Sequence, residues 1–216
     1  MLLTDLPRND NTGPDMSHQR RKDKRPAEIC AAALDVFSEI GYGAAGMSKI
    51  AERAGVSRPT LYLYYANKQA IFEALIRQSL TPVVTNATAV GDDFQGSTAQ
   101  LLSTTLQMII TQIARPEVSR ILHLIIAERH QFPDLAVFYK AQLVDPGRAL
   151  LHQILQRGVK SGEFRPEIAD LDVRLLLSPG LLSVVWTSLF NSIEPLDMNK
   201  LLQGYIDMLL NGVLKP

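Results

Sequence analysis

The sequence is poor in the features that mark secreted, disulfide-bonded and membrane proteins. Cys30 is its only cysteine, which excludes a disulfide or a cysteine-based metal site within one chain. We expect Cys30 to be a small apolar residue inside a helix. The N-terminus has no basic region followed by an apolar run, so no signal peptide is predicted. The longest apolar stretch, residues 175–186, contains serine and a Pro-Gly pair and is shorter than the ~20 residues that span a bilayer. These absences predict a soluble, cytoplasmic protein with no membrane partner.

Net charge is also absent, but its distribution is uneven. The 22 basic and 22 acidic residues cancel over the 216 residues of the chain. Residues 18–80 hold ten Lys or Arg against six Asp or Glu, a net charge of +4, whereas residues 1–17 and 81–216 each carry −2. A basic N-terminal part suits a protein that contacts phosphates with that part only. With 46% hydrophobic residues, the chain can bury a sizeable core in one or two domains.

The most informative stretch is residues 47–68, MSKIAERAGVSRPTLYLYYANK. Ala51 is small enough for two helices to cross closely, and Gly55 suits a left-handed backbone at the end of the first helix. Ser57 can cap the second helix, and Pro59 fits its first turn, where a missing N–H costs nothing. Leu61 supplies a buried apolar residue. The pattern predicts a helix-turn-helix whose second helix enters the DNA major groove.

Apolar residues recur at helical spacing along most of the chain, without a useful strand pattern or an internal repeat. Gly41 is predicted to end the first helix, and Pro82 to limit or bend the fourth. The predicted helical segments are residues 26–40, 47–54, 58–65, 67–80, 100–114, 117–129, 133–161 (interrupted near residue 145), 169–190 and 197–213. The fold prediction is all-α, with a three-helix N-terminal domain and a larger bundle of about six helices.

Composition divides the chain into three parts. Residues 1–19 are polar and aperiodic, which predicts a disordered tail, and Met16 is a second candidate for the true start. Residues 20–66 are expected to form the DNA-binding domain, and residues 67–216 the second domain. The DNA-binding domain begins with a basic arm that either contacts DNA or stays solvated: Arg20, Arg21, Lys22, Lys24 and Arg25.

Residues 25–75 resemble the DNA-binding domain of the TetR family of one-component bacterial regulators. So many matches in register are more specific than a lone short motif. The second half is also similar to a TetR-type regulatory domain at residues 132–135 and 162–165, although that similarity is less diagnostic. The matching residues in the first part are Ala33, Phe37, Gly41-Tyr42, Ile50-Ala51, Ala54-Gly55-Val56-Ser57, Thr60-Leu61-Tyr62, Tyr65, Lys68 and Ile71.

The resemblance implies a homodimer that binds palindromic, double-stranded operator DNA. It also implies a C-terminal domain that binds a small-molecule effector of unknown identity and pairs through its last two long helices. Most family members are repressors released by their ligand, and no cofactor is predicted.

The chain departs from the family at two places. Ala45-Gly46 stand where hydroxyl residues usually precede the second helix, although the glycine tolerates the cap position and Ser48 could substitute. Tyr64-Tyr65 replace a common His-Phe pair.

Nine residues are predicted to contact DNA. Arg58 and Thr60 lie at the start of the recognition helix, which meets base edges, and arginine can bond guanine in bidentate fashion. Tyr62 and Tyr64 cannot share one narrow core stripe, so their hydroxyls are expected on phosphates. The predicted contacts are Ser48, Lys49, Ser57, Arg58, Pro59, Thr60, Tyr62, Tyr64 and Lys68. Core positions are predicted for Phe37, Ile50, Val56, Leu61 and Tyr65.

The effector is predicted to bind between helices of the bundle. The scarcity of charges among the candidate lining residues favours an apolar or weakly polar effector. Its binding would swing the helix of residues 67–80 and change the separation of the two recognition helices from the ~34–36 Å that DNA requires. Residues 147–160 and 172–190 are the candidate dimer surfaces. The candidate lining residues are Leu106, Ile109, Ile113, Leu122, Ile126, Phe138, Tyr139 and Trp186, although apolar residues at this spacing are more often simply core.

Other functions find little support in the sequence. His123 and His130 are about two helical turns apart, but Glu128 is off their face, so no metal site is predicted. Ser183, His152 and Asp172 are the residue types of a catalytic triad, but no nucleophile-elbow sequence accompanies them. We therefore predict that the protein is not an enzyme. An activator or a ligand-independent regulator is left open. A helical enzyme or small-molecule carrier is a remote alternative.

Overall fold

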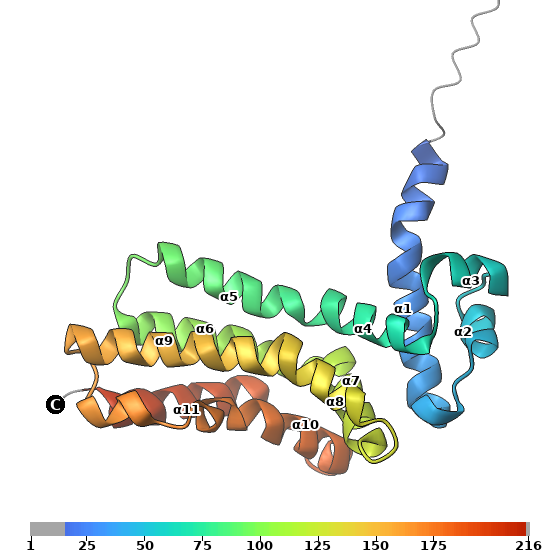
Figure 1. Ribbon diagram of the computed structural model, residues 1–216. Helices are drawn as coiled ribbons and strands as arrows, with labels where there is room; N and C mark the ends of the chain where they lie inside the picture. The colour runs from blue at the N-terminus through green and yellow to red at the C-terminus, as the bar shows by residue number, and fades with distance from the viewer. Residues whose placement is uncertain (1–15, 215–216) are drawn as a thin grey trace, which may run out of the picture.

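The computed structural model describes residues 16–214, and these are almost entirely helical (Figure 1). The extended pairing within this range is an isolated bridge between Phe164 and Leu214. The helices of residues 16–64 lie at one end, and a bundle of long helices extends away from them (Figure 1). The all-α prediction is confirmed. Of the predicted tail, residues 1–15 lie outside the described residues.

Helix α1 (Met16–Ala44) begins earlier than predicted. Residues 16–19, expected in the disordered tail, instead form its first turn. Gly41 interrupts the helix, with φ 81° and ψ 155°, at the residue where the sequence predicted its end. A Cβ at Gly41 would also lie 2.8 Å from the Oε1 of Glu128. The break brings the side chain of Tyr42 into the buried core.

Helices α2 (Met47–Arg53) and α3 (Arg58–Tyr64) form the predicted helix-turn-helix. Gly55 between them has φ 63°, and nothing lies within 4 Å of the position that a Cβ would take. The need for glycine there is therefore conformational rather than steric. Ala51 and Leu61 are buried, as expected for the crossing point of the two helices.

Helix α4 (Lys68–Ser79) leads from the helix-turn-helix into the bundle, and α5 (Thr81–Asp93) continues after a break at Leu80. The side chain of Asn67 caps α4 by accepting the Ala70 N–H at 2.9 Å. The sequence did not predict α5, because its valines, threonines and glycine are poor helix formers. Packing supplies the missing stability, since Ala87 is fully buried where α5 lies against α6 and α9.

The remaining elements build the bundle. The predicted break in residues 133–161 appears as a π-helical turn, Lys140–Val144, between α8 and α9. The single helix predicted for residues 169–190 is wrong: two 3₁₀ turns, Pro166–Asp170 and Val173–Leu177, precede α10. The helices are α6 (Thr98–Ile113), α7 (Pro116–Glu128), α8 (Pro133–Tyr139), α9 (Asp145–Ser161), α10 (Ser178–Phe190) and α11 (Met198–Val213).

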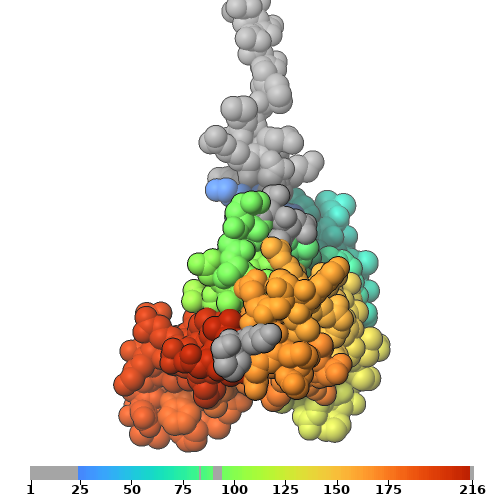
Figure 2. Space-filling model, turned by 90° about the vertical axis from the view of Figure 1, so that its left-hand side faces the viewer, coloured from blue at the N-terminus to red at the C-terminus, as the bar shows by residue number. Residues whose placement is uncertain are grey.

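The far end of the bundle is closed by the turn after α9. The Arg165 N–H donates to the Val213 carbonyl at 3.0 Å, which ties this turn to the end of α11. In the space-filling view, the amber surface of α9 and the turn after it lies beside the red surface of α11 (Figure 2). A Cβ on Gly158 would lie 2.2 Å from the ring of Phe164, so glycine at this position lets the ring pack against α9. The ring of Phe164 is buried in the core of the bundle.

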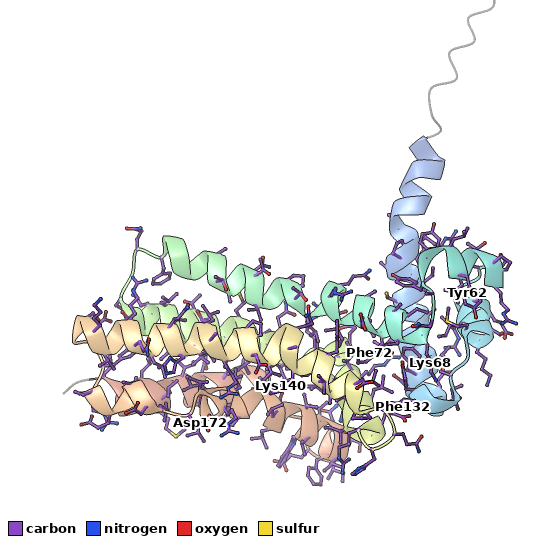
Figure 3. The ribbon with its side chains drawn as sticks, in the orientation of Figure 1. Tyr62, Lys68, Phe72, Phe132, Lys140 and Asp172 are labelled. Atoms are coloured by element: carbon purple, nitrogen blue, oxygen red, sulfur yellow. The ribbon has the colours of Figure 1, made fainter. Side chains whose placement is uncertain are left out.

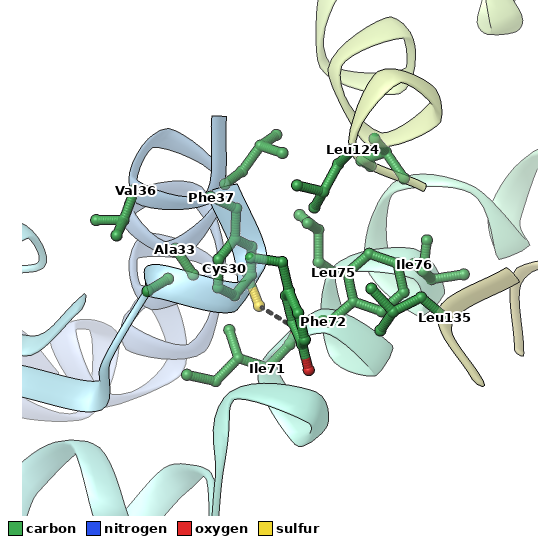
Figure 4. Close-up of a cluster of buried hydrophobic side chains, with 14 of the residues drawn as sticks. Cys30, Ala33, Val36, Phe37, Ile71, Phe72, Leu75, Ile76, Leu124 and Leu135 are labelled. Atoms are coloured by element: carbon green, nitrogen blue, oxygen red, sulfur yellow. Dashed lines mark hydrogen bonds between the residues drawn. The ribbon is translucent and has the colours of Figure 1, made fainter. Parts of the chain in front are cut away.

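Two cores hold the molecule together. The first core joins the helix-turn-helix to the bundle, because Phe37 of α1 and Phe72 of α4 pack in one cluster with Leu124 of α7 and Leu135 of α8 (Figure 4). The second core lies among α5, α6, α9 and α11. The three N-terminal helices are therefore packed directly against part of the bundle.

Candidate DNA-binding surface and ligand cavity

The N-terminus of α3 is preorganised by the residue that precedes it. The Ser57 Oγ accepts the Thr60 N–H at 3.2 Å, and the two hydroxyls lie 2.7 Å apart. Pro59 occupies the first turn, as predicted. This cap leaves Arg58 and Pro59 exposed at the start of the helix, where a recognition helix meets base edges.

The other predicted DNA contacts on α2 and α3 differ in exposure. Ser48 and Lys49 are exposed on α2, and the side chain of Tyr62 is 46% exposed on α3 (Figure 3). Tyr64 is half-buried and packs against the first core, so less of its side chain is free than we expected. Contact of these residues with DNA remains a prediction.

Leu63 is a surface residue of α3 that the sequence reasoning missed. It is 85% exposed, the largest exposed fraction among the exposed large hydrophobic residues of the described chain. An apolar side chain on a recognition helix can pack against a thymine methyl group. The signal in the sequence is its position between Tyr62 and Tyr64, two residues predicted to contact DNA.

Tyr65 and Cys30 take the positions expected of them. Cys30 is buried within α1, and its Sγ lies 3.4 Å from the Tyr65 hydroxyl. That hydroxyl also donates to the Pro26 carbonyl at 3.4 Å. Burial raises the pKa of both the Cys30 thiol and the Tyr65 hydroxyl. Both side chains are therefore neutral at physiological pH, and their contact joins α1 to the residue that ends α3.

Lys68 is directed toward protein atoms. Its Nζ donates to the carbonyls of Tyr42 at 2.6 Å and Gly43 at 3.0 Å. It also lies 4.5 Å from the ring centroid of Tyr42 and 5.4 Å from that of Phe132 (Figure 3). Desolvation lowers the pKa of Lys68, and the nearby Glu128 carboxylate opposes that shift. Two of the three ammonium donors are thus occupied, which gives Lys68 a structural role beside its predicted phosphate contact.

Glu128 completes this junction from the bundle side. Its Oε1 accepts the N–H of Tyr42 at 2.8 Å and that of Gly43 at 3.5 Å. The Tyr42 ring packs edge-on against Phe132, with centroids 4.9 Å apart. We call the group of Tyr42, Gly43, Lys68, Glu128 and Phe132 the interdomain latch. It joins the end of α1, the start of α4 and the α7–α8 turn.

The first family departure is visible at the start of α2. Gly46 is the N-cap, with φ −104° and ψ 153°, and α2 has no side-chain cap hydrogen bond. Ala45 is buried and has no side-chain oxygen that could cap the helix. The hydroxyl that usually occupies this position is therefore absent, and Ser48 does not replace it as a cap.

A cavity of about 250 Å³ lies beside the α4–α5 break at Leu80, between α5 and the bundle helices α6, α7, α9 and α10. Four of the eight predicted residues line it: Ile109, Ile113, Leu122 and Tyr139. The lining that the prediction missed is Leu80, Val84, Gln112, Val118, Leu143, Val144, Gly147, Arg148, Arg174, Leu177 and Leu181.

The other four predicted lining residues lie elsewhere. Leu106 is fully buried in the second core, and Ile126 is 54% exposed on the surface of α7. Phe138 packs against the first core with the guanidinium of Arg77 5.0 Å from its ring centroid. Trp186 donates its Nε1–H to the Glu194 carbonyl at 2.9 Å. Helical spacing alone does not tell which apolar face meets a cavity and which meets another helix.

Most of the cavity wall is aliphatic, but two arginines reach it. Arg174 is paired with Asp172, whose carboxylate accepts its Nε–H at 2.9 Å and its backbone N–H at 3.0 Å. These hydrogen bonds lower the pKa of Asp172 to about 2. The Nε of Arg148 is buried and has no hydrogen-bond partner among the described residues.

Helix α10 exposes much of its apolar surface. Leu181, Leu182, Val185, Leu189 and Phe190 are each 41–61% exposed. The stretch Val173–Phe190 is, among the described residues, the one helical stretch apolar and long enough to cross a membrane by length and composition alone, and a third of it is buried. An exposed apolar surface of this extent is typical of a site where another protein surface binds.

The catalytic and metal alternatives gain no support from these positions. No group of three or more metal-ligating residues is found within the described part of the chain. The hydroxyl of Ser183 is buried in α10 and donates to the Gly180 carbonyl at 2.7 Å. His152 is exposed on α9, and Asp172 is engaged by Arg174.

Comparison with known families identifies both halves of the chain. A family model described as bacterial regulatory proteins, tetR family, matches residues 29–75. A second, described as tetracyclin repressor-like, C-terminal domain, matches residues 93–201. The first covers part of α1, the helix-turn-helix and most of α4. The second covers the bundle from the end of α5 to the start of α11.

Individual relatives agree with this assignment. The chain is 32% identical over 155 residues to the uncharacterized HTH-type transcriptional regulator YdeS of Bacillus subtilis, covering 70% of this chain and 73% of that one. It is 24% identical over 220 residues to the HTH-type transcriptional repressor KstR2 of Rhodococcus jostii, covering 99% of each chain. Its fold is similar to that of FadR from Bacillus subtilis in complex with stearoyl-CoA, with a TM-score of 0.68, 23% identity and coverage of 86% and 98%.

Proposed function

Because the chain belongs to the TetR family of bacterial transcriptional regulators, we propose that it is a repressor that binds a palindromic operator as a homodimer. A small, largely apolar effector that occupies the cavity would release the protein from this operator. The observation that carries this proposal is the exposed, capped N-terminus of α3. Arg58 and Tyr62 are exposed there, and Thr60 is partly exposed. These positions support contacts of Arg58 and Thr60 with base edges and of Tyr62 with a phosphate, as in a recognition helix.

The exposed apolar face of α10 supports dimerisation. Together with Met208 of α11, which is 67% exposed, it offers an apolar surface that a second copy can cover. Helix α9, also predicted as a dimer surface, suits this role less. Its buried Leu151 and Ile154 face its own chain, and its exposed His152 and Arg157 are polar. We therefore assign the interface to α10 and α11.

The cavity supports an effector with a substantial apolar part. Its wall is mainly leucine, isoleucine and valine side chains. FadR of Bacillus subtilis, which shares the fold, was solved with stearoyl-CoA. A ligand with a long acyl chain therefore belongs among the first compounds to test.

The cavity and the latch suggest how effector and operator compete. Leu80 at the α4–α5 break and Leu122 of α7 both line the cavity. Helices α4 and α7 are the elements that pack α1 into the first core and carry Lys68 and Glu128 of the latch. An effector that separates these helices would rotate the helix-turn-helix and change the spacing of the paired recognition helices. By linkage, operator binding must weaken effector binding by the same factor.

The proposal is tested by selecting genomic fragments with the purified protein and titrating the enriched fragment at several salt concentrations. We expect a short palindrome that is bound more weakly as salt rises, because phosphate contacts release counterions. No sequence enrichment would contradict the proposed operator binding.

Dimerisation has its own test. Val185, 50% exposed on α10, is changed to glutamate, with Gln153→Glu on the exposed face of α9 as the control. In sedimentation experiments we expect Val185→Glu to be a folded monomer and the control to stay dimeric. A wild-type monomer at micromolar concentration, or an unaffected dimer in Val185→Glu, would overturn the assigned interface.

A further inference from the structure

The cavity wall has one polar feature that an apolar ligand alone does not explain. Arg148, on the first turn of α9, lines the cavity, and its Nε is buried without a hydrogen-bond partner among the described residues. A buried donor without an acceptor destabilises a fold, and it destabilises more when the group is charged. A bound ligand that supplies the acceptor would remove this cost.

The carboxylates near Arg148 are already engaged. Asp172 accepts three N–H groups of Arg174, one from the backbone and two from the guanidinium. Asp145, three residues before Arg148, accepts the Lys140 ammonium at 2.7 and 2.8 Å. The Arg174 side chain is 72% exposed and forms an ion pair with Asp172. The side chain of Arg148 is half-buried, and its buried Nε has no hydrogen-bond partner among the described residues, so Arg148 is the arginine of the cavity wall that can receive an anion.

From this geometry we infer that the effector is an organic anion: its apolar chain fills the aliphatic part of the cavity, and its oxyanion accepts hydrogen bonds from Arg148. The inference rests on the proposed function, because the cavity is the proposed effector site. It deepens that proposal by naming the chemical class of the ligand. A guanidinium forms strong, directional hydrogen bonds with carboxylate and phosphate oxygens.

Two kinds of compound share this chemistry. A free alkanoic acid carries a carboxylate at the end of the chain, and an acyl-CoA carries phosphates beyond its thioester. Decanoate, decanoyl-CoA and the uncharged methyl decanoate therefore form a discriminating set, with hexanoate and hexadecanoate to vary chain length. Binding to the full-length protein is measured by calorimetry and by the shift of its melting temperature, neither of which requires DNA.

The key variant is Arg148→Met, which removes the charge and keeps much of the apolar side chain. The matched control is Arg157→Met, on the exposed face of the same helix. We expect Arg148→Met to lower the affinity for the anion that binds best by about tenfold to a hundredfold. This factor corresponds to the usual free energy of a hydrogen bond to a charged group. Binding of methyl decanoate should be unchanged, and Arg157→Met should behave as wild type.

The unliganded protein offers a second readout. Because Arg148→Met removes a buried donor that has no partner, we expect its melting temperature without ligand to equal or exceed that of wild type. If the methionine variant does not fold, Arg148→Gln replaces it in both measurements. Preference for decanoate identifies a free acid, and preference for decanoyl-CoA identifies a thioester.

The inference is overturned if no anion of the series binds wild type, if methyl decanoate binds as tightly as decanoate and decanoyl-CoA, or if Arg148→Met leaves anion affinity unchanged. Failure of the proposed function is distinguishable from these results, because operator binding is measured separately by fragment selection. An anion that depends on Arg148 but never alters operator affinity would support the assigned ligand class and contradict its role as effector.

Discussion

Glu128, the last residue of α7, accepts the backbone N–H of Tyr42 at 2.8 Å, although 86 residues separate the two in sequence. The contact exists because Gly41 turns the end of α1 toward the bundle with a backbone conformation that other residues rarely adopt. A carboxylate of the regulatory bundle thus fixes the backbone of the DNA-binding domain directly. This contact gives the bundle a means of positioning α1 and the helix-turn-helix that packs on it.

We expect Glu128→Ala to lower the free energy of unfolding by about 1–3 kcal/mol, because it leaves the partly buried Tyr42 N–H without its charged acceptor. Chemical denaturation measures the loss, with Glu167→Ala, at an exposed position, as the control. The variant should also show a smaller effect of the effector on operator affinity. Wild-type stability together with an unchanged effector response would show that the latch does not couple the domains.

Lys68→Ala and Tyr62→Phe should separate positioning of the helix-turn-helix from direct phosphate contact. Lys68→Ala removes the donor to the Tyr42 and Gly43 carbonyls, so melting temperature and operator affinity should fall together. Tyr62→Phe should weaken operator binding without changing the melting temperature, because its side chain is 46% exposed. Thermal melts and operator titrations measure both. If Lys68→Ala instead lowers the salt slope by about one at unchanged stability, its main role is on a phosphate.

A hydroxyl placed at Gly46 should restore the missing cap of α2. The backbone of Gly46 is extended, and nothing lies within 4 Å of a Cβ there, so serine fits without strain. We expect Gly46→Ser to raise stability by a few tenths of a kcal/mol and to strengthen operator binding through an added phosphate contact. Gly46→Ala is the control, since it adds the Cβ without the hydroxyl. Equal behaviour of the two variants would argue against a cap or phosphate role for this position.

Glu163 should contribute to stability against acid. Desolvation alone would raise its pKa, but hydrogen bonds from the N–H and hydroxyl of Thr98 and the N–H of Ala99 outweigh it and hold the pKa below the ordinary value of a glutamate. A lowered carboxyl pKa contributes stability that is present above the unfolded-state pKa and is lost as the pH falls through the folded-state pKa. Glu163→Gln should therefore be less stable than wild type at neutral pH and show a shallower loss below pH 4.5 in pH-dependent melts. Parallel curves would contradict this role.

Local signals were sufficient to predict the helix-turn-helix. Gly55, Ser57 and Leu61 each have a requirement set by their immediate neighbours: a left-handed backbone, a cap and a buried crossing point. The structure places all three as predicted. Direct contact of α3 residues with DNA stays a prediction, because it depends on a partner.

Features that depend on tertiary contacts were not predictable in this way. Helix α5 has poor intrinsic propensity and is held by packing, as the fully buried Ala87 indicates. The cavity lining was half predicted, since Leu106 and Ile109 are both buried in the second core but only Ile109 also reaches the cavity. The sequence offers Glu128 only as a candidate metal ligand, because nothing in it relates this residue to Tyr42.

The most direct test of the account is whether Arg58 reads one base pair of the operator. Affinities of wild type and Arg58→Ala are measured for the selected palindrome and for versions substituted symmetrically at each position. We predict that Arg58→Ala weakens binding to the palindrome by about 1–3 kcal/mol and loses discrimination at one position in each half-site, while discrimination elsewhere is kept. Unchanged discrimination at every position would contradict the assignment of α3 as the element that reads the operator.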